Sequence, residues 1–541
     1  MLFTPEIVGM AKVYYKILFT FCLVLFLTLG ILKGCNDSSN SEGIYPPKYS
    51  HSALYNGYVK DSFIILAPSK QYVKGSVHKF FFGEHYRDLW ALPVKCQILD
   101  ISHEKGGVSI LKKGGNMQTL SLRLETPLKK RYVIRSIDKD QSKALPEKLK
   151  NTFVKNVFRD QTSALNPFGA LIIPTLAQAA GILHTNPELF IVPYDSAFKE
   201  YKDEFSGAMV IMEEFPDESW VGTPTFWNAD EIVESEDFIK DRFKSTHARA
   251  DVRLYARSRL FDAWINDWDR HSGQWKWAVY HSGSNKVYKP IPRDRDMSFY
   301  KFDDGLLNKI ALLINDKFQS FNSKFDNAGG LLKNAWYFDG LLLPQLTLKD
   351  WTGIADSLAR SLDDKVIDEA CKNMPREAYS LVGKSISEKL ISRRSQLKDL
   401  AEKYYKILNE KVSIVGTDNP ERFEITRNDN NVHVKMTSFG ELIYDKEFDL
   451  KTTSEISIFS LKGNDTIVVE GNVKKSATLN IYSGEGVDFV EENSEVEAWG
   501  RSTLIFDTPQ NNNIKFGKEG KDETSIDAIL DYDRVGVRKK E

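Results

Sequence analysis

Residues 262–277 read DAWINDWDRHSGQWKW, and residues 290–299 read PIPRDRDMSF. Both stretches place acidic side chains where a helical or extended run ends. Phosphoryl transfer needs one carboxylate to orient the attacking hydroxyl, and one or two further side chains to hold Mg²⁺ against the phosphates. Asp269 suits the first role. A charged helix end followed by a solvated turn is the structural alternative. The candidate metal-side residues are Gln274, Asp294 and Asp296.

A glycine-rich hairpin and a basic strand precede these two stretches. Residues 106–123 read GGVSILKKGGNMQTLSLR, and Gly114 and Gly115 lie between two β-rich runs. A glycine pair allows the backbone to approach a phosphate closely. The next run, YVIRSIDKD, carries Arg135, which could grip nucleotide phosphates. A plain hairpin turn would explain the glycine pair equally well.

The order of elements predicts an α+β protein with a separate all-β end. Short β-rich runs, among them FIILA, SVHKFFF, VKCQILDI, TLSLRL and YVIRSI, occupy residues 61–135. Helical spacing follows at 145–183, 234–268 and 305–410. From residue 412 the chain is all β, either a short solenoid or a sandwich. The predicted units are 1–35 (signal peptide), 36–60 (tether), 61–411 (β-rich lobe to about 215, helical lobe after it) and 412–541 (β-rich domain).

The acidic motifs resemble the catalytic segments of atypical kinases. Asp269-Arg-His with a polar residue at the fifth position is similar to the catalytic loop of HipA-like toxin kinases, phosphoinositide kinases and secretory-pathway protein kinases. The stretch from Asp294 to Phe299 resembles their metal-binding Asp motif and the corresponding motif of CotH kinases. The resemblance implies that Asp269 is catalytic, that Gln274 and Asp294 bind metal, and that Arg135 grips phosphate. It further implies a helix acid beside Arg135, for which Asp160 is the candidate.

A wider resemblance covers most of the chain. FFGEHYRDLWALPVK, LAQAAGILHTNPELFIVP and INDWDRHSGQWKWA look like an envelope module of Bacteroidetes. That module is otherwise found fused to calcineurin-like phosphoesterase and BamA-type surface-antigen barrel regions. The resemblance implies an atypical kinase-like fold, an envelope location and an outer-membrane barrel protein as a partner. Mg²⁺ or Mn²⁺ with ATP or a related nucleotide are the implied cofactors.

The N-terminus reads as a secretory lipoprotein signal. Residues 17–32, ILFTFCLVLFLTLGIL, carry no charge and follow Lys12 and Lys16. Sixteen residues are short for a spanning helix, which needs about 20. Gly34-Cys35 at the end of the run resembles a lipobox, so Cys35 is the predicted lipidation site and the membrane a predicted partner through the lipid anchor. An uncleaved anchor helix is the alternative.

Composition excludes several other classes. Lys plus Arg number 73 against 75 for Asp plus Glu, which argues against a dedicated nucleic-acid-binding protein. Four Cys are too few for a disulfide scaffold. In the C-terminal region, Asp465 and Asp488 lie in Gly-Asp turns resembling degenerate calcium β-roll units. Two imperfect units supply too few oxygens for a complete site, so structural turns are favoured over Ca²⁺ binding.

Three functions remain open from the sequence. The first is a kinase-like envelope lipoprotein that binds Mg²⁺ with a nucleotide or another phosphorylated ligand. The second is a catalytically inactive kinase-fold module that acts as a binding or assembly partner of an outer-membrane barrel protein. The third is a surface binder that works through the β domain. Retained Asp269 and Asp294 favour the first, whereas Arg135 and Gln274 in place of the usual residues favour the second.

Overall fold

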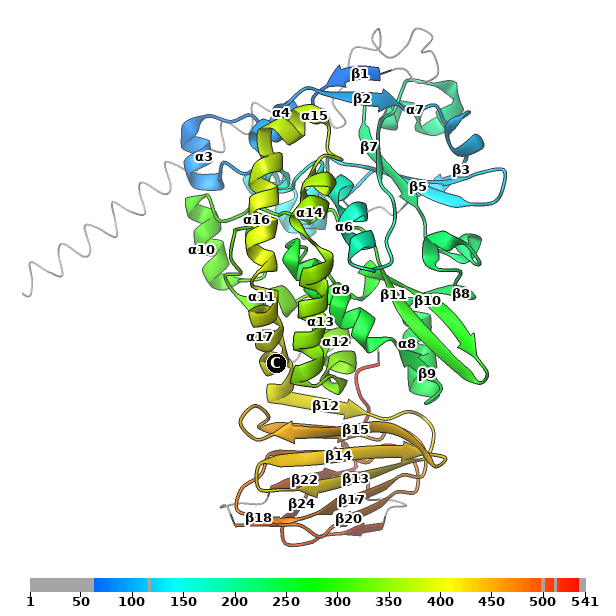
Figure 1. Cartoon of the computed structure of the whole chain (residues 1–541), viewed down its shortest axis with the longest axis vertical. Coiled ribbons are helices and arrows are strands. Elements are labelled where there is room, and N and C mark those ends of the chain that lie inside the picture. Colours follow the sequence, from blue (N-terminus) through cyan, green and yellow to red (C-terminus); the bar gives the residue numbers. More distant parts are fainter. Residues whose placement is uncertain (1–62, 115–117, 498–501, 510–512, 535–541) are drawn as a thin grey trace, which may run out of the picture.

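The computed structural model of the chain describes residues 63–114, 118–497, 502–509 and 513–534. A mixed sheet lies at one end, a largely helical body follows, and a β domain lies at the other end (Figure 1). The fold is therefore α+β with an all-β C-terminal region, as the sequence predicts. In the described residues, no helix has both the length and the apolar character that a membrane span requires. The predicted signal at 17–32 and Cys35 lie outside those ranges.

The first sheet has seven strands in the order β1-β2-β6-β7-β5-β4-β3. Its burial alternates along the strands, as period-two side-chain geometry requires. One face of β4, β5 and β7 packs into an apolar cluster that includes Leu122, Ile134 and Met212. The opposite face looks toward the helical body. The strands are β1 (Phe63–Leu66), β2 (Val94–Ile98), β3 (Ser109–Lys113), β4 (Ser121–Glu125), β5 (Arg131–Ser136), β6 (Glu188–Ile191) and β7 (Met209–Glu214).

Short helices surround this sheet, and one of them corrects the sequence reading. SVHKFFF, expected as a strand, is helix α3. Its buried residues, His78, Phe81 and Phe82, follow helical spacing, while Val77 and Phe80 are exposed. Three consecutive phenylalanines made the run look like a strand. Phe80 is exposed whereas Phe81 and Phe82 are both buried, which does not fit the alternation of a strand. The helices are α3 (Ser76–Phe82), α4 (Arg87–Ala91), α5 (Phe153–Asp160), α6 (Ile173–Ala179) and α7 (Lys202–Phe205).

The helical body contains a four-stranded sheet, in the order β8-β10-β11-β9. The hairpin of β10 and β11 turns at Ser282 and Asn285, as HSGSN predicts. The tryptophans of the 262–277 stretch are buried core residues: Trp264, Trp268, Trp275 and Trp277. Bounds are β8 (Glu231–Glu234), α8 (Ser235–Lys244), β9 (Ala248–Ala250), α9 (Val252–Trp264), β10 (Trp275–Ser282) and β11 (Asn285–Pro292).

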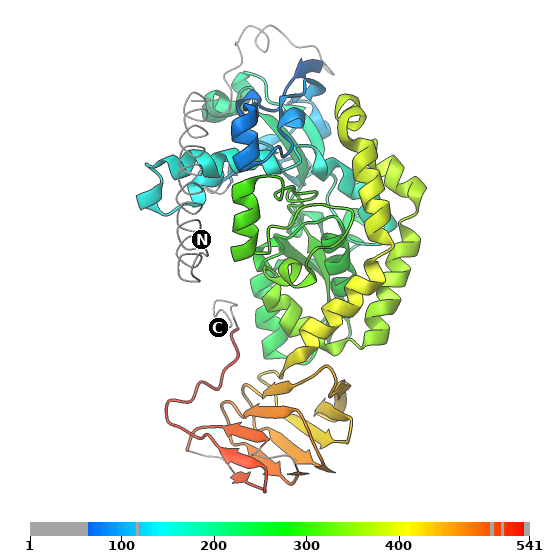
Figure 2. The ribbon, with the colours of Figure 1, turned by 90° about the vertical axis from the view of Figure 1, so that its left-hand side faces the viewer.

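The helices of residues 348–410 lie along one side of this body, as Figure 2 shows. Within the helical stretch predicted over 305–410, α16 and α17 are separate helices, divided at Ser395 and Gln396. Bounds are α10 (Leu306–Ile314), α11 (Ala328–Leu332), α12 (Trp336–Leu342), α13 (Leu348–Ser361), α14 (Asp364–Cys371), α15 (Arg376–Ala378), α16 (Lys384–Arg394) and α17 (Leu397–Glu410).

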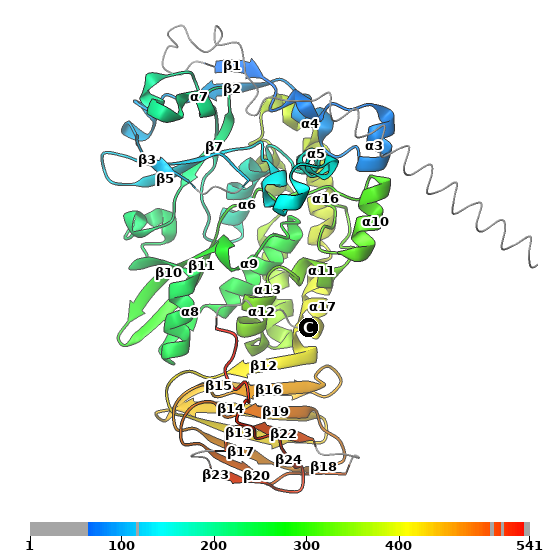
Figure 3. The same ribbon diagram turned by 180° about the vertical axis from the view of Figure 1, so that it is seen from behind.

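The C-terminal region is a short parallel solenoid rather than a sandwich (Figure 3). Equivalent positions of successive coils lie 23 residues apart, as with Asp465 and Asp488, and β13, β14 and β15 form an antiparallel end. Bounds are β12 (Lys411–Val415), β13 (Glu421–Arg427), β14 (Asn431–Ser438), β15 (Glu441–Asp449), β16 (Glu455–Phe459), β17 (Thr466–Glu470), β18 (Asn472–Val473), β19 (Thr478–Tyr482), β20 (Phe489–Glu492), β21 (Glu495–Val496), β22 (Thr503–Phe506), β23 (Asn513–Lys515) and β24 (Gly520–Asp522).

A buried lysine joins the solenoid to the helical body. Lys446 on β15 donates hydrogen bonds to Pro344 O (2.5 Å), Leu346 O (2.9 Å) and Asn409 Oδ1 (2.7 Å). These acceptors are neutral, and burial lowers the pKa of Lys446 from 10.5 to about 7. The solenoid therefore docks through a specific polar contact as well as through apolar packing.

Candidate functional site

A cleft lies between the first sheet and the end of β11. Its polar lining combines cations from the sheet side with acids from the loop that follows β11. An apolar wall that includes Leu165, Pro187 and Ile211 faces them. Concave sites with a few convergent polar groups are the usual places for small ligands. The charged residues of the lining are Arg135, Lys139, Glu213, Asp294, Arg295 and Asp296.

Arg135 reaches this cleft because of its register in the sheet. It pairs with Ser121 on β4 and Ile211 on β7, so its side chain shares their face, opposite the core residue Ile134. Its guanidinium forms an ion pair with Glu213 on β7. Burial alone would lower the pKa of Arg135, but the charges of Glu213 and Asp294 raise it overall. Arg135 therefore stays a cation at the wall of the cleft, as the sequence requires of a phosphate-gripping residue.

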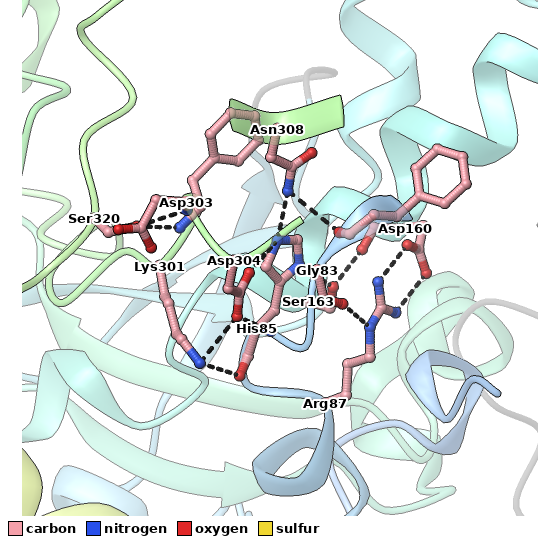
Figure 4. A network of polar contacts seen from close by, with 12 residues as sticks. Gly83, His85, Arg87, Asp160, Ser163, Lys301, Asp303, Asp304, Asn308 and Ser320 are labelled. Carbon is pink, nitrogen blue, oxygen red and sulfur yellow. Dashed lines mark hydrogen bonds and ion pairs between the residues drawn. The ribbon is translucent and has the colours of Figure 1, made fainter. Parts of the chain in front are cut away.

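The structure corrects the expectation that Asp160 orients Arg135 (Figure 4). Both carboxylate oxygens of Asp160 accept hydrogen bonds from Arg87, at 2.7 and 2.6 Å, and His78 lies 2.8 Å away. Asp160 ends α5 beside the α3–α4 segment, so it anchors those helices to each other. Glu213 takes the place expected for Asp160.

Four cationic side chains act on the carboxylate of Asp294. It follows β11 in the left-handed region, with φ 56°, and Arg270 holds the local backbone by donating to Arg293 O (2.9 Å) and Asp294 O (3.0 Å). Burial would raise the pKa of Asp294, but the charges of Arg135, Lys139 and two further arginines lower it to about 2. No described residue forms a hydrogen bond or ion pair with its carboxylate. Asp294 is thus an ionised carboxylate with free oxygen atoms.

Lys139 is a site residue that the sequence analysis missed. It is 8% exposed and forms an ion pair with Asp296 across the cleft. Burial lowers its pKa, while the charges of Asp294 and then Asp269 act in the opposite direction. The signal was present in YVIRSIDKD, where Lys139 follows Arg135 by four residues. From the sequence, a basic residue just after a strand is expected to lie in an exposed turn. The burial of Lys139 depends on the tertiary fold.

Asp269 lies near this group without lining the cavity. It follows α9 in a loop, is half-buried, and its Oδ1 accepts a hydrogen bond from Asn334 Nδ2 at 3.0 Å. Its charge acts on Lys139 and opposes the effect of burial on the pKa of that lysine. The preceding acid, Asp267, is buried against Arg270 at 2.8 Å. Of these two carboxylates, Asp269 is the one that a bound molecule could contact.

The remaining predicted site residues lie at the margin of the cleft or outside the described chain. The backbone O of Gln274 accepts from Arg293 N at 3.1 Å, and its side chain does not line the cavity. Gly114 closes the β3–β4 hairpin, where a Cβ would meet Ser121 Oγ at 2.3 Å. Gly115 lies outside the described residues. Thr119, at the far end of this hairpin, is the hairpin residue that lines the cavity.

The acids present fit a metal held jointly with a ligand. In the described ranges, no cluster of three His, Cys, Asp or Glu side chains could hold an ion by itself. Mg²⁺, however, is usually held by one or two carboxylates together with substrate phosphates and water. Asp294, with its free oxygens, and Asp296, once released from Lys139, match that donor set.

No family model matches this sequence, and no curated protein matches it. Among solved structures, it is similar to the crystal structure of a Helicobacter pylori proinflammatory kinase, CtkA. The match has 11% sequence identity and a TM-score of 0.28, and it covers 56% of this chain and 98% of that one. At this level of similarity, the geometry of the cleft has to carry the functional inference.

Proposed function

We propose that this cleft binds a nucleoside triphosphate or a related phosphorylated ligand together with Mg²⁺ or Mn²⁺, in an atypical kinase-like arrangement. One observation carries the proposal: the Asp294 carboxylate lines the cleft beside Arg135 and Lys139, and no described residue forms a hydrogen bond or ion pair with its oxygens. A cation bound beside it, bridged to phosphate, would satisfy both the acid and the surrounding arginines.

The cationic and the acidic residues of the cleft would have different roles. Arg135 and Lys139 would bind phosphate oxygens, which replace Glu213 and Asp296 as their partners. Asp294 and the released Asp296 would hold the metal, which neutralises charge on the phosphates when bound. Asp269 would accept the proton of an incoming hydroxyl and orient that hydroxyl toward the phosphate.

A binding function without transfer is the second candidate, and a specific feature favours it. The two cations of the cleft already have internal partners, Glu213 for Arg135 and Asp296 for Lys139. Ligand binding must break the Lys139–Asp296 pair, and this cost weakens affinity. Asp269 is likewise held by Asn334. A module that binds weakly and transfers nothing would serve as an assembly partner of an outer-membrane barrel protein.

Thermal unfolding of the full chain tests the binding proposal. Mg²⁺ with ATP should raise the melting temperature, because a ligand at 100 times its Kd adds about 2.7 kcal/mol of stability. Asp294→Asn should abolish this rise, and Asp269→Asn should keep it while losing phosphate transfer. Asp429→Asn, at an exposed turn of the solenoid, is the matched control. An equal rise in wild type and Asp294→Asn would contradict the assignment.

The Asp294 variant has to be compared with its own ligand-free state. Because the folded pKa of Asp294 is below its ordinary value, ionised Asp294 stabilises the fold above pH 4, by about 2 kcal/mol. Asp294→Asn should therefore lower the ligand-free melting temperature as well. The binding readout is the shift between ligand-free and ligand-bound protein, measured for each variant separately.

We place the protein in the cell envelope as a lipoprotein, a proposal supported by residues 17–32 and by Gly34-Cys35. Metabolic labelling with a fatty-acid probe tests it. Wild type should be labelled and Cys35→Ala should not, with Cys22→Ala as a control for cysteine loss. Labelling that persists in Cys35→Ala would refute lipidation at that residue.

A further inference from the structure

A second cavity lies at the junction between the helical body and the solenoid. The body lines it with residues of α8, β9 and α12, and the solenoid lines it with residues of β12, β14 and β15 (Figure 1). It shares no lining residue with the proposed nucleotide cleft. Among the described residues that line it are two arginines, Arg242 and Arg249, and no acid. A concave site lined by charges of one sign attracts ligands of the opposite sign, so this cavity favours an anion.

Arg242, on α8, is fixed in place while part of its guanidinium stays free. Its Nη1 donates to Gly416 O at 3.0 Å, and its Nη2 donates to Val415 O at 2.7 Å. These two bonds use two of the five guanidinium N–H groups, and the other three have no acceptor in the described chain. Burial lowers the pKa of Arg242, and the charge of Glu421 opposes this effect. The oxygens of Glu421, however, accept hydrogen bonds from Thr417 instead.

Arg249, on β9, lines the same cavity. Its Nε donates to Thr246 O at 2.9 Å. Within the described ranges, its one carboxylate partner is Glu441, at 3.6 Å, and the side chains of both residues are exposed. Exposed ion pairs of this kind contribute little stability, so a ligand could displace Glu441 at small cost. The terminal N–H groups of Arg249 are therefore available to an anion.

Two hydroxyl groups complete the polar part of the lining. Thr246 precedes β9 and is 5% exposed, and Ser413 lies on β12 of the solenoid. Both side chains line the cavity, yet neither hydroxyl group forms a hydrogen bond within the described residues. Buried polar groups are normally paired, so the unpaired hydroxyl of Thr246 points to a ligand at this position. Apolar side chains form much of the remaining wall, including Leu342, Met436 and Ile443.

We propose that this junction cavity binds a small organic anion, with its carboxylate or phosphate group held by Arg242 and Arg249. Guanidinium groups bind such oxyanions through charge-assisted hydrogen bonds, and the two hydroxyl groups supply further donors. The apolar wall selects a ligand whose anionic group is attached to a hydrocarbon chain. Because the lining comes from both units, the bound anion would hold the solenoid against the helical body. This site does not depend on nucleotide binding in the cleft.

Calorimetric titration of the full chain tests the site, without nucleotide or divalent metal and at constant ionic strength. The probes are hexanoate and hexyl phosphate, and hexanol and inorganic phosphate are controls that lack the charge or the chain. Arg249→Gln should weaken probe binding about tenfold or more, as expected for a lost hydrogen bond to a charged group. Arg422→Gln is the matched control, because Arg422 is an exposed solenoid arginine paired with Glu424 at 2.9 Å, and it should leave the Kd unchanged.

Hydrogen exchange followed by mass spectrometry locates the bound probe. Peptides covering 235–250 and 411–417 should become protected, and protection confined to the nucleotide cleft would overturn the proposal. Arg242→Gln should also weaken binding, but it removes two bonds to the solenoid, so circular dichroism has to establish that it is folded.

The outcomes of the titration are distinct. Binding of either probe that is lost in Arg249→Gln supports the site, and the probe that binds identifies the anionic group. Binding of neither probe, equal affinity in wild type and Arg249→Gln, or equal affinity for hexanol and the anions would each overturn the proposal. Asp294→Asn should lose the Mg²⁺–ATP shift and keep probe binding, so failure of the nucleotide site and failure of the junction site give different results.

Discussion

A ladder of buried acids makes the solenoid sensitive to pH. Glu421 N donates to Asp465 Oδ1 at 2.8 Å, and Asp465 N donates to Asp488 Oδ1 at 2.8 Å. Asp465 and Asp488 are both 1% exposed. Burial, strengthened by the charge of Glu421, raises the pKa of Asp465 to about 8, and burial raises that of Asp488 to about 6. At neutral pH, Asp465 is therefore protonated in the folded state and ionised in the unfolded state.

The sign of the effect follows from proton linkage. An acid whose pKa is higher in the folded state binds more protons when folded, so stability is greatest at low pH and falls as pH rises from about 4 to about 8. For Asp465 alone, the loss is about 4 kcal/mol by pH 7 and about 6 kcal/mol by pH 9. These are upper values, because Glu421 and Asp488 compete for the same protons.

Asp465→Asn removes this dependence without changing the shape of the side chain. The amide oxygen can still accept from Glu421 N, so the variant should equal wild type at about pH 4 and exceed it in stability at pH 8. Hydrogen exchange of peptides covering β16 to β20, followed by mass spectrometry, measures this locally. Asp429→Asn, an exposed acid of the same domain, should change nothing. A variant less stable than wild type at pH 8, or a wild type insensitive to pH from 5 to 8, would refute the reasoning.

Three further perturbations follow from buried polar groups elsewhere. Asp160→Asn should destabilise the protein by about 3–5 kcal/mol in urea unfolding, because it leaves the Arg87 guanidinium buried without its counter-charge; an effect below 1 kcal/mol would count against it. His85, whose pKa burial lowers to about 4, should contribute stability above pH 6.5 that is lost as pH falls toward 4, and His85→Gln should flatten the acid limb of the stability profile. Lys446→Met should leave three carbonyl acceptors without a donor, cost about 1–3 kcal/mol, and increase proteolysis between residues 408 and 420; unchanged cleavage would contradict its role in docking.

The sequence predicted the acids of the cleft better than their partners. Arg135, Asp294 and Asp296 meet in one cavity because Arg135 lies on β5 and the two acids lie in the loop after β11, and both strands can be recognised in the sequence. Lys139 and Glu213 were missed because their roles depend on which strands become neighbours. The pairing of β5 with β7 joins residues 78 positions apart, and no local pattern encodes it.

The wrong predictions for the SVHKFFF run and for the partner of Asp160 have a related cause. Asp160 was matched with Arg135 from the order of elements, whereas its actual partners come from the segment before β2. The run SVHKFFF was assigned by its aromatic content, although its burial follows helical spacing. For the C-terminal region the sequence left a solenoid and a sandwich open, and the parallel pairing of strands in successive coils decides for the solenoid.

The pairing of charges in the cleft separates the two candidate functions more sharply than the presence of any single acid. Glu213 and Asp296 occupy the cations that a phosphate would need, so the ligand-free cleft is closed by its own ion pairs. Ligand binding therefore has to open the Lys139–Asp296 pair, and phosphate transfer has in addition to free Asp269 from Asn334.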